Sequence, residues 1–313
     1  MAKPTYGGWV SFTAHLALKY NYKVYKIGKR TEKLKSGKDR LRKFGYGVTY
    51  QNISIEDAIK LDKVLITAID KNYYIHLKHF KKASLVIHDP TEIKGRSCQP
   101  VIDHLNKFKI ITIRKSVKQY LLKNHNIKAE FKVHPFYTYP TTKKPKSGAV
   151  SISRIDFDKH IDVILEANKL LPTDNKIEIY GATNDRYVYF KLKPSNLNFE
   201  TYYKGKFKKS FVDLDGILSD KKFVVDLSAI KNDGGGSQYT FLEAIYQNCI
   251  LVLSSKWLVH GSNIFTNNVN CIVVENSNDI AQIIMKHKEL GLDLESIRKE
   301  SKKLLEPHIK VKW

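Results

Sequence analysis

The chain is poor in cysteine: only Cys98, Cys249 and Cys271 occur among 313 residues, and no CxxC pair is present. This scarcity excludes a disulfide scaffold and a structural zinc site of closely spaced cysteines. No apolar run approaches the roughly 20 residues of a membrane helix. The first residues, MAKPTYGGWVSF, lack the hydrophobic core of a signal peptide. We expect a reduced, cytoplasmic location, in the host cytoplasm if the protein is viral.

Acidic residues are also few, and they are unevenly spread. Lys and Arg number 54 against 31 Asp and Glu, which gives a formal net charge of +23. Residues 1–150 hold 31 basic and 10 acidic residues, whereas residues 151–313 hold 23 and 21. An excess of positive charge attracts polyanions without specifying a fold. We therefore expect the N-terminal half to bind a polyanionic partner.

The length and composition are typical of a globular protein with two domains. Hydrophobic residues make up 42% and charged residues 27% of the chain, as in ordinary folded proteins. Residues 140–148, PTTKKPKSG, resemble a linker because they combine prolines, a glycine and small polar residues. The charge balance changes at the same place. We predict domains at residues 1–145 and 146–313.

Both halves alternate short apolar runs with longer amphipathic stretches. The predicted strands are 23–27, 63–67, 84–88, 110–113, 131–134, 149–152, 176–180, 223–227, 250–254 and 271–274. The predicted helices are 10–20, 55–60, 73–80, 117–124, 158–171, 212–219, 239–247, 278–290 and 294–305. This alternation indicates βαβ units. The predicted fold class is α/β: two Rossmann-like domains whose parallel sheets face an interdomain cleft, where ligands bind at the strands' carboxyl ends.

Two motifs in the first half are candidates for function. Gly7 and Gly8 directly precede the first predicted helix, where small residues let a ligand approach an anion-binding helix N-terminus. His88 and Asp89 end the apolar run ASLVI, at a strand terminus where polar functional residues gather. The alternative for the glycine pair is a simple turn, and the alternative for His88 and Asp89 is a solvated strand end.

The second half carries cations beside a predicted helix start. Ser153 and Arg154 end its first strand, Lys159 follows, and Asp156 or Asp158 is placed to cap the helix. Two fixed cations beside exposed helical amides bind a diphosphate without a metal. The alternative is an Arg and a Lys on a solvated face.

Residues 223–255 are the most informative segment. A buried strand enters a loop with three consecutive glycines, Gly234 to Gly236, and a helix that carries Glu243 follows. The exposed amides of such a loop favour an anion. A carboxylate facing this loop is suited to accept hydrogen bonds from ribose hydroxyls.

Together these motifs resemble those of retaining, nucleotide-sugar-dependent glycosyltransferases of the GT-B fold, in the same order over nearly the whole chain. The matching residues are Gly7 and Gly8, His88 and Asp89, Ser153, Arg154 and Lys159, Asp226 to Ser228, and Gly235 to Glu243. Two positions depart from the family pattern. His160 stands where glycine is usual, and Gly235 replaces the first glutamate of the paired-glutamate motif. In the family that glutamate contacts the transferred sugar or its phosphate, and here Asp233 or backbone amides would take part of this role.

The resemblance implies a retaining hexosyltransferase that moves glucose or another hexose from a UDP-sugar to an acceptor hydroxyl. It implies no tightly bound cofactor and no required metal. The implied catalytic residues are His88, Asp89, Arg154 and Lys159. The implied donor-binding residues are Gly7, Gly8, Ser153, Arg154, Lys159, Tyr180, Gly181, Ser228, Asp233, Gly235, Gly236, Ser237, Gln238, Tyr239 and Glu243.

The segment ASLVIHDPTEIKGRS resembles, more loosely, the DNA α-glucosyltransferases of T-even phages. The predicted acceptor is therefore DNA with a hydroxymethylated base, flipped out of the duplex. Residues 29–47 are predicted as a loop or short helix that contacts it. The predicted acceptor residues are Lys29, Arg30, Lys33, Lys35, Lys38, Arg40, Arg42, Lys43 and Arg96. A composition rich in Lys, Ile, Asn and Tyr is compatible with an AT-rich phage or viral genome.

Three alternatives stay open at this point. Residues 29–43 fit a solvated charge run as well as a binding surface. The second alternative is a glycosyltransferase whose acceptor is a polysaccharide or a glycolipid. The aromatic residues between Trp9 and Tyr25 suit the membrane surface at which a lipid acceptor lies. The third alternative is a nucleic-acid-binding protein that has kept this fold but is not catalytic.

Overall fold

The computed structural model describes residues 8–27, 41–68, 74–89, 93, 99–230, 238–258 and 264–313. The chain divides into two compact units. The first comprises Met1–Thr138, Asn232–Gly234 and His308–Trp313, and the second comprises Tyr139–Lys231 and Gly235–Pro307.

The linker-like stretch at residues 140–148 is packed on the second unit. The backbone N–H and the hydroxyl of Thr142 donate to the two oxygens of Asp215, at 2.9 and 2.6 Å. Lys146 donates to the carbonyl of Leu218 at 2.9 Å. This segment therefore behaves as part of the second unit's surface.

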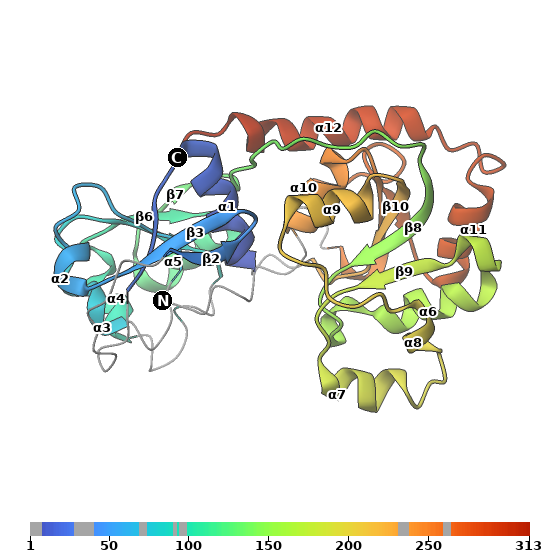
Figure 1. Ribbon diagram of the computed structural model, residues 1–313, viewed down its shortest axis with the longest axis horizontal. Coiled ribbons are helices and arrows are strands. Elements are labelled where there is room, and N and C mark those ends of the chain that lie inside the picture. Colours follow the sequence, from blue (N-terminus) through green and yellow to red (C-terminus); the bar gives the residue numbers. More distant parts are fainter. Residues whose placement is uncertain are drawn as a thin grey trace. The chain divides into compact units, whose positions relative to one another are not determined.

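The described part of the first unit contains two sheets (Figure 1). A three-stranded sheet has the order β1-β3-β2, with β1 at Val24–Ile27, β2 at Arg42–Gly45 and β3 at Val48–Ile53. A parallel sheet has the order β4-β5-β6-β7, with strands at Leu65–Ile66, Ser84–Ile87, Lys109–Thr112 and Glu130–Phe131. The helices are α1 (Gly8–Tyr20), α2 (Ile55–Ala58), α3 (Tyr74–Leu77), α4 (Gln99–Leu105) and α5 (Lys115–His125).

The hairpin of β2 and β3 corrects the sequence prediction of a loop or short helix over residues 29–47. Arg42 and Lys43 lie in β2, which pairs antiparallel with β3. Tyr46 and Gly47 join the strands with φ values of 54° and 79°. Two consecutive left-handed residues form the tight turn that matches the twist of a hairpin. The preceding residues 28–40 lie outside the described part of the chain.

The C-terminal residues of the chain bind the first unit. Lys19 of α1 donates to the carbonyl of His308 at 3.0 Å, and the Tyr22 hydroxyl donates to that of Trp313 at 3.2 Å. The Trp313 ring packs edge-on against buried Phe12, with 5.1 Å between ring centroids. Because Phe12 is buried here, it is not part of an exposed aromatic surface between Trp9 and Tyr25.

The second unit is built on one parallel sheet of order β12-β11-β10-β8-β9. Its strands are β8 (Ser147–Ile152), β9 (Ile177–Tyr180), β10 (Lys221–Asp226), β11 (Ile250–Ser254) and β12 (Ile272–Val274). Its helices are α6 (Ile161–Leu170), α7 (Asp185–Tyr187), α8 (Phe199–Tyr202), α9 (Phe211–Leu218), α10 (Gln238–Tyr246), α11 (Ser277–Lys286) and α12 (Leu294–Lys310), whose last residues belong to the first unit.

Helices cover both faces of this sheet (Figure 1). Helices α6 and α11 pack together on one face, and α9 and α10 lie on the other. All five residues of β11 are buried, as are the last four of β10. Near-continuous apolar runs are typical of parallel strands that are covered on both faces, which explains why the sequence predicted these strands closely.

The predicted α/β fold class is confirmed, and every predicted strand and helix overlaps an observed element. One predicted helix, residues 158–171, is divided. A short 3-10 turn at Phe157–Lys159 precedes α6, and His160 separates them with a left-handed φ of 49°. Helices α4, α7 and α8 and a π-helical turn at Val188–Leu192 were not predicted.

Candidate active site

The strand order of the second unit contains a point where the chain reverses direction across the sheet. From β8 the chain proceeds to β9 on one side, and it later returns to β10 on the other side. Loops that leave such a neighbouring pair in opposite directions open a crevice at the carboxyl ends of the strands. Ser153 follows β8 and Ser228 follows β10, so the structure brings these two predicted site residues to the same edge.

Hydrogen bonds connect the loops at this edge. The Ser228 N–H donates to Asp226 Oδ1 at 2.8 Å, which fixes the turn after β10. The Ala229 N–H donates to the Asp158 carbonyl at 3.2 Å, which ties the β10 loop to the β8 loop. Thr240, in the first turn of α10, donates its hydroxyl to the Ile152 carbonyl at 3.3 Å. The N-terminus of α10 therefore lies beside the end of β8, and the N-terminus of a helix favours an anion.

Arg154 and Lys159 flank a short acidic turn. Arg154 Nε lies 2.9 Å from Asp156 Oδ2, and Lys159 Nζ lies 3.3 Å from Asp158 Oδ2. Although burial would raise the pKa of Asp158, Lys159 and Arg154 hold it below its usual value. The Arg154 side chain is 60% exposed, whereas Lys159 is buried. One cation is thus fixed in the protein, and the other faces solvent at the same edge.

His160 occupies the position where the family pattern has glycine. Its left-handed φ of 49° is a conformation that glycine adopts without strain. Its ring stacks flat on Trp257, which follows β11, with 3.6 Å between ring centroids and 3° between ring planes. Burial lowers the pKa of His160, and Asp162 opposes this decrease. The stack offsets the conformational cost of a side chain at this position.

Glu243 lies within α10 and is buried, with 3% of its surface exposed. Its Oε2 accepts a hydrogen bond from the hydroxyl of Tyr139. The sequence analysis missed Tyr139, because nothing local to it signals a partner 104 residues away.

Gly181 follows β9 and has its backbone fully engaged. Its N–H donates to the Gly205 carbonyl at 3.0 Å, and its carbonyl accepts from the Tyr203 hydroxyl at 2.8 Å. A Cβ atom at Gly181 would lie 1.7 Å from the Ser153 carbonyl oxygen. The structure thus gives Gly181 a packing function beside Ser153, and its contact with a donor stays a prediction, as does that of half-buried Tyr180.

Other predicted site residues lie at the start of α10 or outside the described part of the chain. Gln238 begins α10 and half-buried Tyr239 follows it. The predicted residues outside the described part of the chain are Gly7, Lys29, Arg30, Lys33, Lys35, Lys38, Arg40, Arg96, Asp233, Gly235, Gly236 and Ser237.

In the first unit, His88 directly follows β5 and is half-buried. Its Nε2 lies 2.7 Å from the Thr67 carbonyl oxygen, so this nitrogen carries the proton and donates. Phe12 packs edge-on against the imidazole at 4.8 Å between ring centroids. Burial lowers the pKa of His88 to about 4, and the nearby Arg114 charge adds to the decrease. His88 is therefore a neutral imidazole at pH 7, next to Asp89. Gly8 begins α1 and is exposed.

We expect the first unit to lose stability in mild acid. A histidine whose folded pKa lies below its unfolded pKa stabilises the protein above the unfolded value, near pH 6.5, and this contribution is lost as the pH falls toward 4. His88 alone predicts a loss of about 2 kcal/mol between pH 7 and pH 5. Burial also lowers the pKa of His134 and His308, so they add in the same direction.

Hydrogen exchange of the α1 and β5 amides at pH 7 and pH 5 measures this loss within the first unit. His88→Gln cannot titrate, so the variant is expected to lose clearly less stability than the wild type over this interval. An identical pH dependence in both proteins would exclude His88 as a source of the acid sensitivity.

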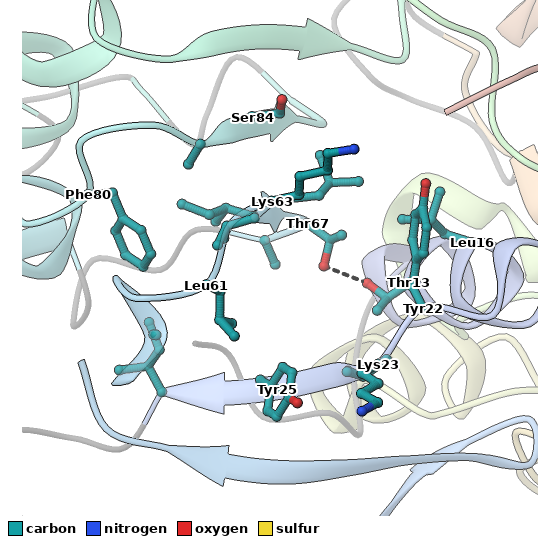
Figure 2. A pocket seen from close by; sticks show the side chains of 18 of the residues that line it. Thr13, Leu16, Tyr22, Lys23, Tyr25, Leu61, Lys63, Thr67, Phe80 and Ser84 are labelled. Carbon is teal, nitrogen blue, oxygen red and sulfur yellow. Dashed lines mark hydrogen bonds between the residues drawn. The ribbon is translucent and has the colours of Figure 1, made fainter. Parts of the chain in front are cut away.

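The first unit also contains a cavity of about 960 Å³ (Figure 2). Its walls include α1, β1 and β4, and the Thr13 hydroxyl donates to that of Thr67 across 2.8 Å. Among the described residues, β1 and β4 are each paired along one edge only. None of the predicted site residues within the described part of the chain lines this cavity, so it is not part of the donor or acceptor site predicted from the sequence.

No group of three or more His, Cys, Asp or Glu side chains from the residues that the structure describes is arranged to hold a metal ion. None of the helices formed by these residues is long and apolar enough to cross a membrane.

Solved structures with the fold of this chain are glycosyltransferases. HepE of Anabaena, in complex with UDP-glucose, gives a TM-score of 0.70 at 11% identity over 98% of this chain and 93% of its own. A glycosyltransferase of Rickettsia africae gives 0.61 at 16% identity over 96% and 91%. The pneumococcal O-GlcNAc transferase GtfA, in complex with UDP and GlcNAc, gives 0.55 at 17% identity over 80% and 55%.

At these identities the likeness shows the fold, that of the GT-B class with two Rossmann-like units. This chain spans about half the length of GtfA. No family model matches the chain, and no curated protein is significantly similar to it in sequence.

Proposed function

We propose that this protein transfers a sugar from a UDP-sugar to an acceptor hydroxyl. The observation that carries the proposal is the edge of the second unit where Arg154, Lys159, Ser228 and the N-terminus of α10 converge. Two cations and a helix N-terminus suit the diphosphate of a nucleotide-sugar. The UDP held by HepE and by GtfA supports the same donor class.

The proposed chemistry assigns each residue a task. Arg154 and Lys159 hold the diphosphate and stabilise the charge that develops on it as it leaves. Glu243 accepts hydrogen bonds from the ribose hydroxyls. The bond from the anomeric carbon to the phosphate oxygen breaks, the acceptor oxygen bonds to that carbon on the same face, and the leaving phosphate takes the acceptor's proton. Configuration is thereby retained. His88 and Asp89 contact the hexose, which is glucose or a similar sugar, or the acceptor hydroxyl.

The proposed acceptor is a polyanion bound by the first unit, and DNA with a hydroxymethylated base is our first candidate. Arg42 and Lys43 are exposed on β2 and are the predicted acceptor residues that the structure describes. Lysines and arginines that neutralise phosphates make binding dependent on salt.

Charge reversal at Arg42 and Lys43 tests the acceptor. On duplex DNA, the log–log slope of affinity against salt is about −0.9 per phosphate contact. Arg42→Glu with Lys43→Glu is therefore expected to flatten the slope by about 2 and to raise the acceptor KM. UDP affinity should not change, because Arg154, Lys159 and Glu243, which are proposed to hold the diphosphate and the ribose, lie in the second unit. An unchanged salt slope would remove these residues from the acceptor site.

A polysaccharide or glycolipid acceptor is the second candidate. The two acceptors are separated by incubating the enzyme and UDP-sugars with hydroxymethylcytosine DNA, then digesting the DNA to nucleosides for mass measurement. Detection of hexosylated nucleosides supports DNA as the acceptor. Their absence, together with transfer to a glycan or lipid, supports the second candidate.

The donor is tested first, by thermal shift with UDP-, GDP- and ADP-sugars. Stabilisation by UDP-sugars above the others is expected. If no nucleotide stabilises the protein, the transferase proposal fails and the non-catalytic nucleic-acid-binding alternative is favoured.

A further inference from the structure

A buried hydrogen bond links Glu243 to the segment that begins the second unit. The Tyr139 hydroxyl donates to Glu243 Oε2. Both side chains are enclosed, with 5% of Tyr139 and 3% of Glu243 exposed. A buried carboxylate needs hydrogen bonds to replace the water that it has lost. Tyr139 therefore supplies part of what keeps Glu243 stable in the interior.

The Tyr139 ring is held by stacking, and its backbone carbonyl is engaged separately. Its ring stacks on Phe211 of α9, with 4.2 Å between ring centroids and 22° between ring planes. The Tyr246 hydroxyl donates to the backbone carbonyl of Tyr139. Burial raises the pKa of Tyr139 far above its ordinary value, and the Glu243 charge raises it further. The phenol consequently stays protonated and remains a donor at every working pH.

This rigid donor acts on the orientation of Glu243. A carboxylate at the end of a glutamate side chain rotates about its last bond, and that torsion is broad when nothing fixes it. Tyr139 binds one oxygen, so the orientation of the carboxylate is restricted before any ligand arrives. A polar group held in its productive orientation binds more tightly because less conformational freedom is lost on binding.

We propose that Tyr139 is a positioning residue that orients Glu243 toward the ribose of the donor and thereby sets a preference for ribonucleotides over 2′-deoxyribonucleotides. The proposal rests on the proposed function, in which Glu243 accepts the ribose hydroxyls. Oε2 is bound to Tyr139, and a carboxylate oxygen accepts more than one hydrogen bond, so both oxygens of Glu243 can take part in ribose contacts.

The test compares the Kd values for UDP and 2′-deoxy-UDP by isothermal titration calorimetry. A hydrogen bond to a charged group contributes enough for the wild type to bind UDP about tenfold more tightly than 2′-deoxy-UDP. Tyr139→Phe keeps the ring and its stacking on Phe211 but removes the donor. This variant is expected to reduce the ratio to about threefold or less, mainly by weakening UDP. A purely structural role would weaken both ligands equally and leave the ratio unchanged.

Tyr246→Phe is the matched control. It removes a neighbouring tyrosine hydroxyl that binds the Tyr139 backbone and leaves the Tyr139–Glu243 hydrogen bond in place. The ratio of its affinities for UDP and 2′-deoxy-UDP should equal that of the wild type. Glu243→Gln alone and combined with Tyr139→Phe completes a double-mutant cycle, in which effects on the ratio should be clearly less than additive because both residues act through one contact.

Each outcome separates the two proposals. If the wild type discriminates between the ligands and folded Tyr139→Phe does so equally, the positioning role is wrong and the proposed function stands. Additive effects in the cycle would also overturn it. If the wild type does not bind UDP, the proposed function is wrong and the inference falls with it. Circular dichroism and urea unfolding of each variant show that the ratios come from folded protein.

Discussion

Replacing Gly181 with alanine is expected to destabilise the second unit by about 3 kcal/mol or more. The added Cβ would lie 1.7 Å from the carbonyl oxygen and 2.8 Å from the carbonyl carbon of Ser153. Both atoms belong to the backbone, so no side-chain rotation relieves the collision. The segments after β8 and β9 would have to separate, and the hydrogen bond from the Ser153 N–H to the Tyr180 carbonyl, at 3.1 Å, would be strained.

Urea unfolding of wild type and Gly181→Ala measures this loss. Gly216→Ala is the control, because Gly216 lies in α9 and a Cβ atom added there would meet no atom from elsewhere in the fold within 4 Å. Alanine in a helix interior is favoured over glycine by about 0.5–1 kcal/mol, so the control should be unchanged or slightly stabilised. A Gly181→Ala protein as stable as the control would show that the two segments do not approach as closely as the structure indicates.

Replacing Arg154 or Lys159, the two cations proposed to hold the diphosphate, with alanine is expected to weaken UDP binding by about ten- to a hundredfold. Charge-assisted hydrogen bonds contribute about 1.5–3 kcal/mol each, and 1.4 kcal/mol corresponds to a factor of ten. Lys159→Ala should show the larger effect, because Lys159 is buried and its charge is less screened by water than that of exposed Arg154. Calorimetric titration of each variant with UDP gives the affinities.

Lys191→Ala is the control for a lost cation in the same unit. Lys191 is half exposed and forms an ion pair with Asp162 at 3.3 Å, and pairs of this kind contribute little to stability. Its UDP affinity should equal that of the wild type. If Arg154→Ala and Lys159→Ala also bind UDP normally while remaining folded, the diphosphate is held elsewhere.

The sequence located the strand ends at which the donor is proposed to bind, because the signals for these strands are local. Apolar runs bounded by polar residues specified β8, β10 and β11, and parallel strands place their carboxyl ends at one edge whatever the details of packing. Ser153, Arg154 and Ser228 follow directly from those strands. The hairpin of β2 and β3 was missed, although Tyr46 and Gly47 form its turn, because the neighbouring lysines and arginines obscured the alternation of a strand.

The amino-acid sequence by itself determined the α/β class, the order of most strands and helices and the charge difference between the two halves, because each depends on composition or on neighbours along the chain. Only the tertiary structure decided that Tyr139 binds Glu243, that Gly181 has no room for a side chain beside Ser153, and that His160 stacks on Trp257. These contacts join residues far apart in sequence. They depend on strand register and on how helices pack against the sheet, and no local pattern of residues specifies either.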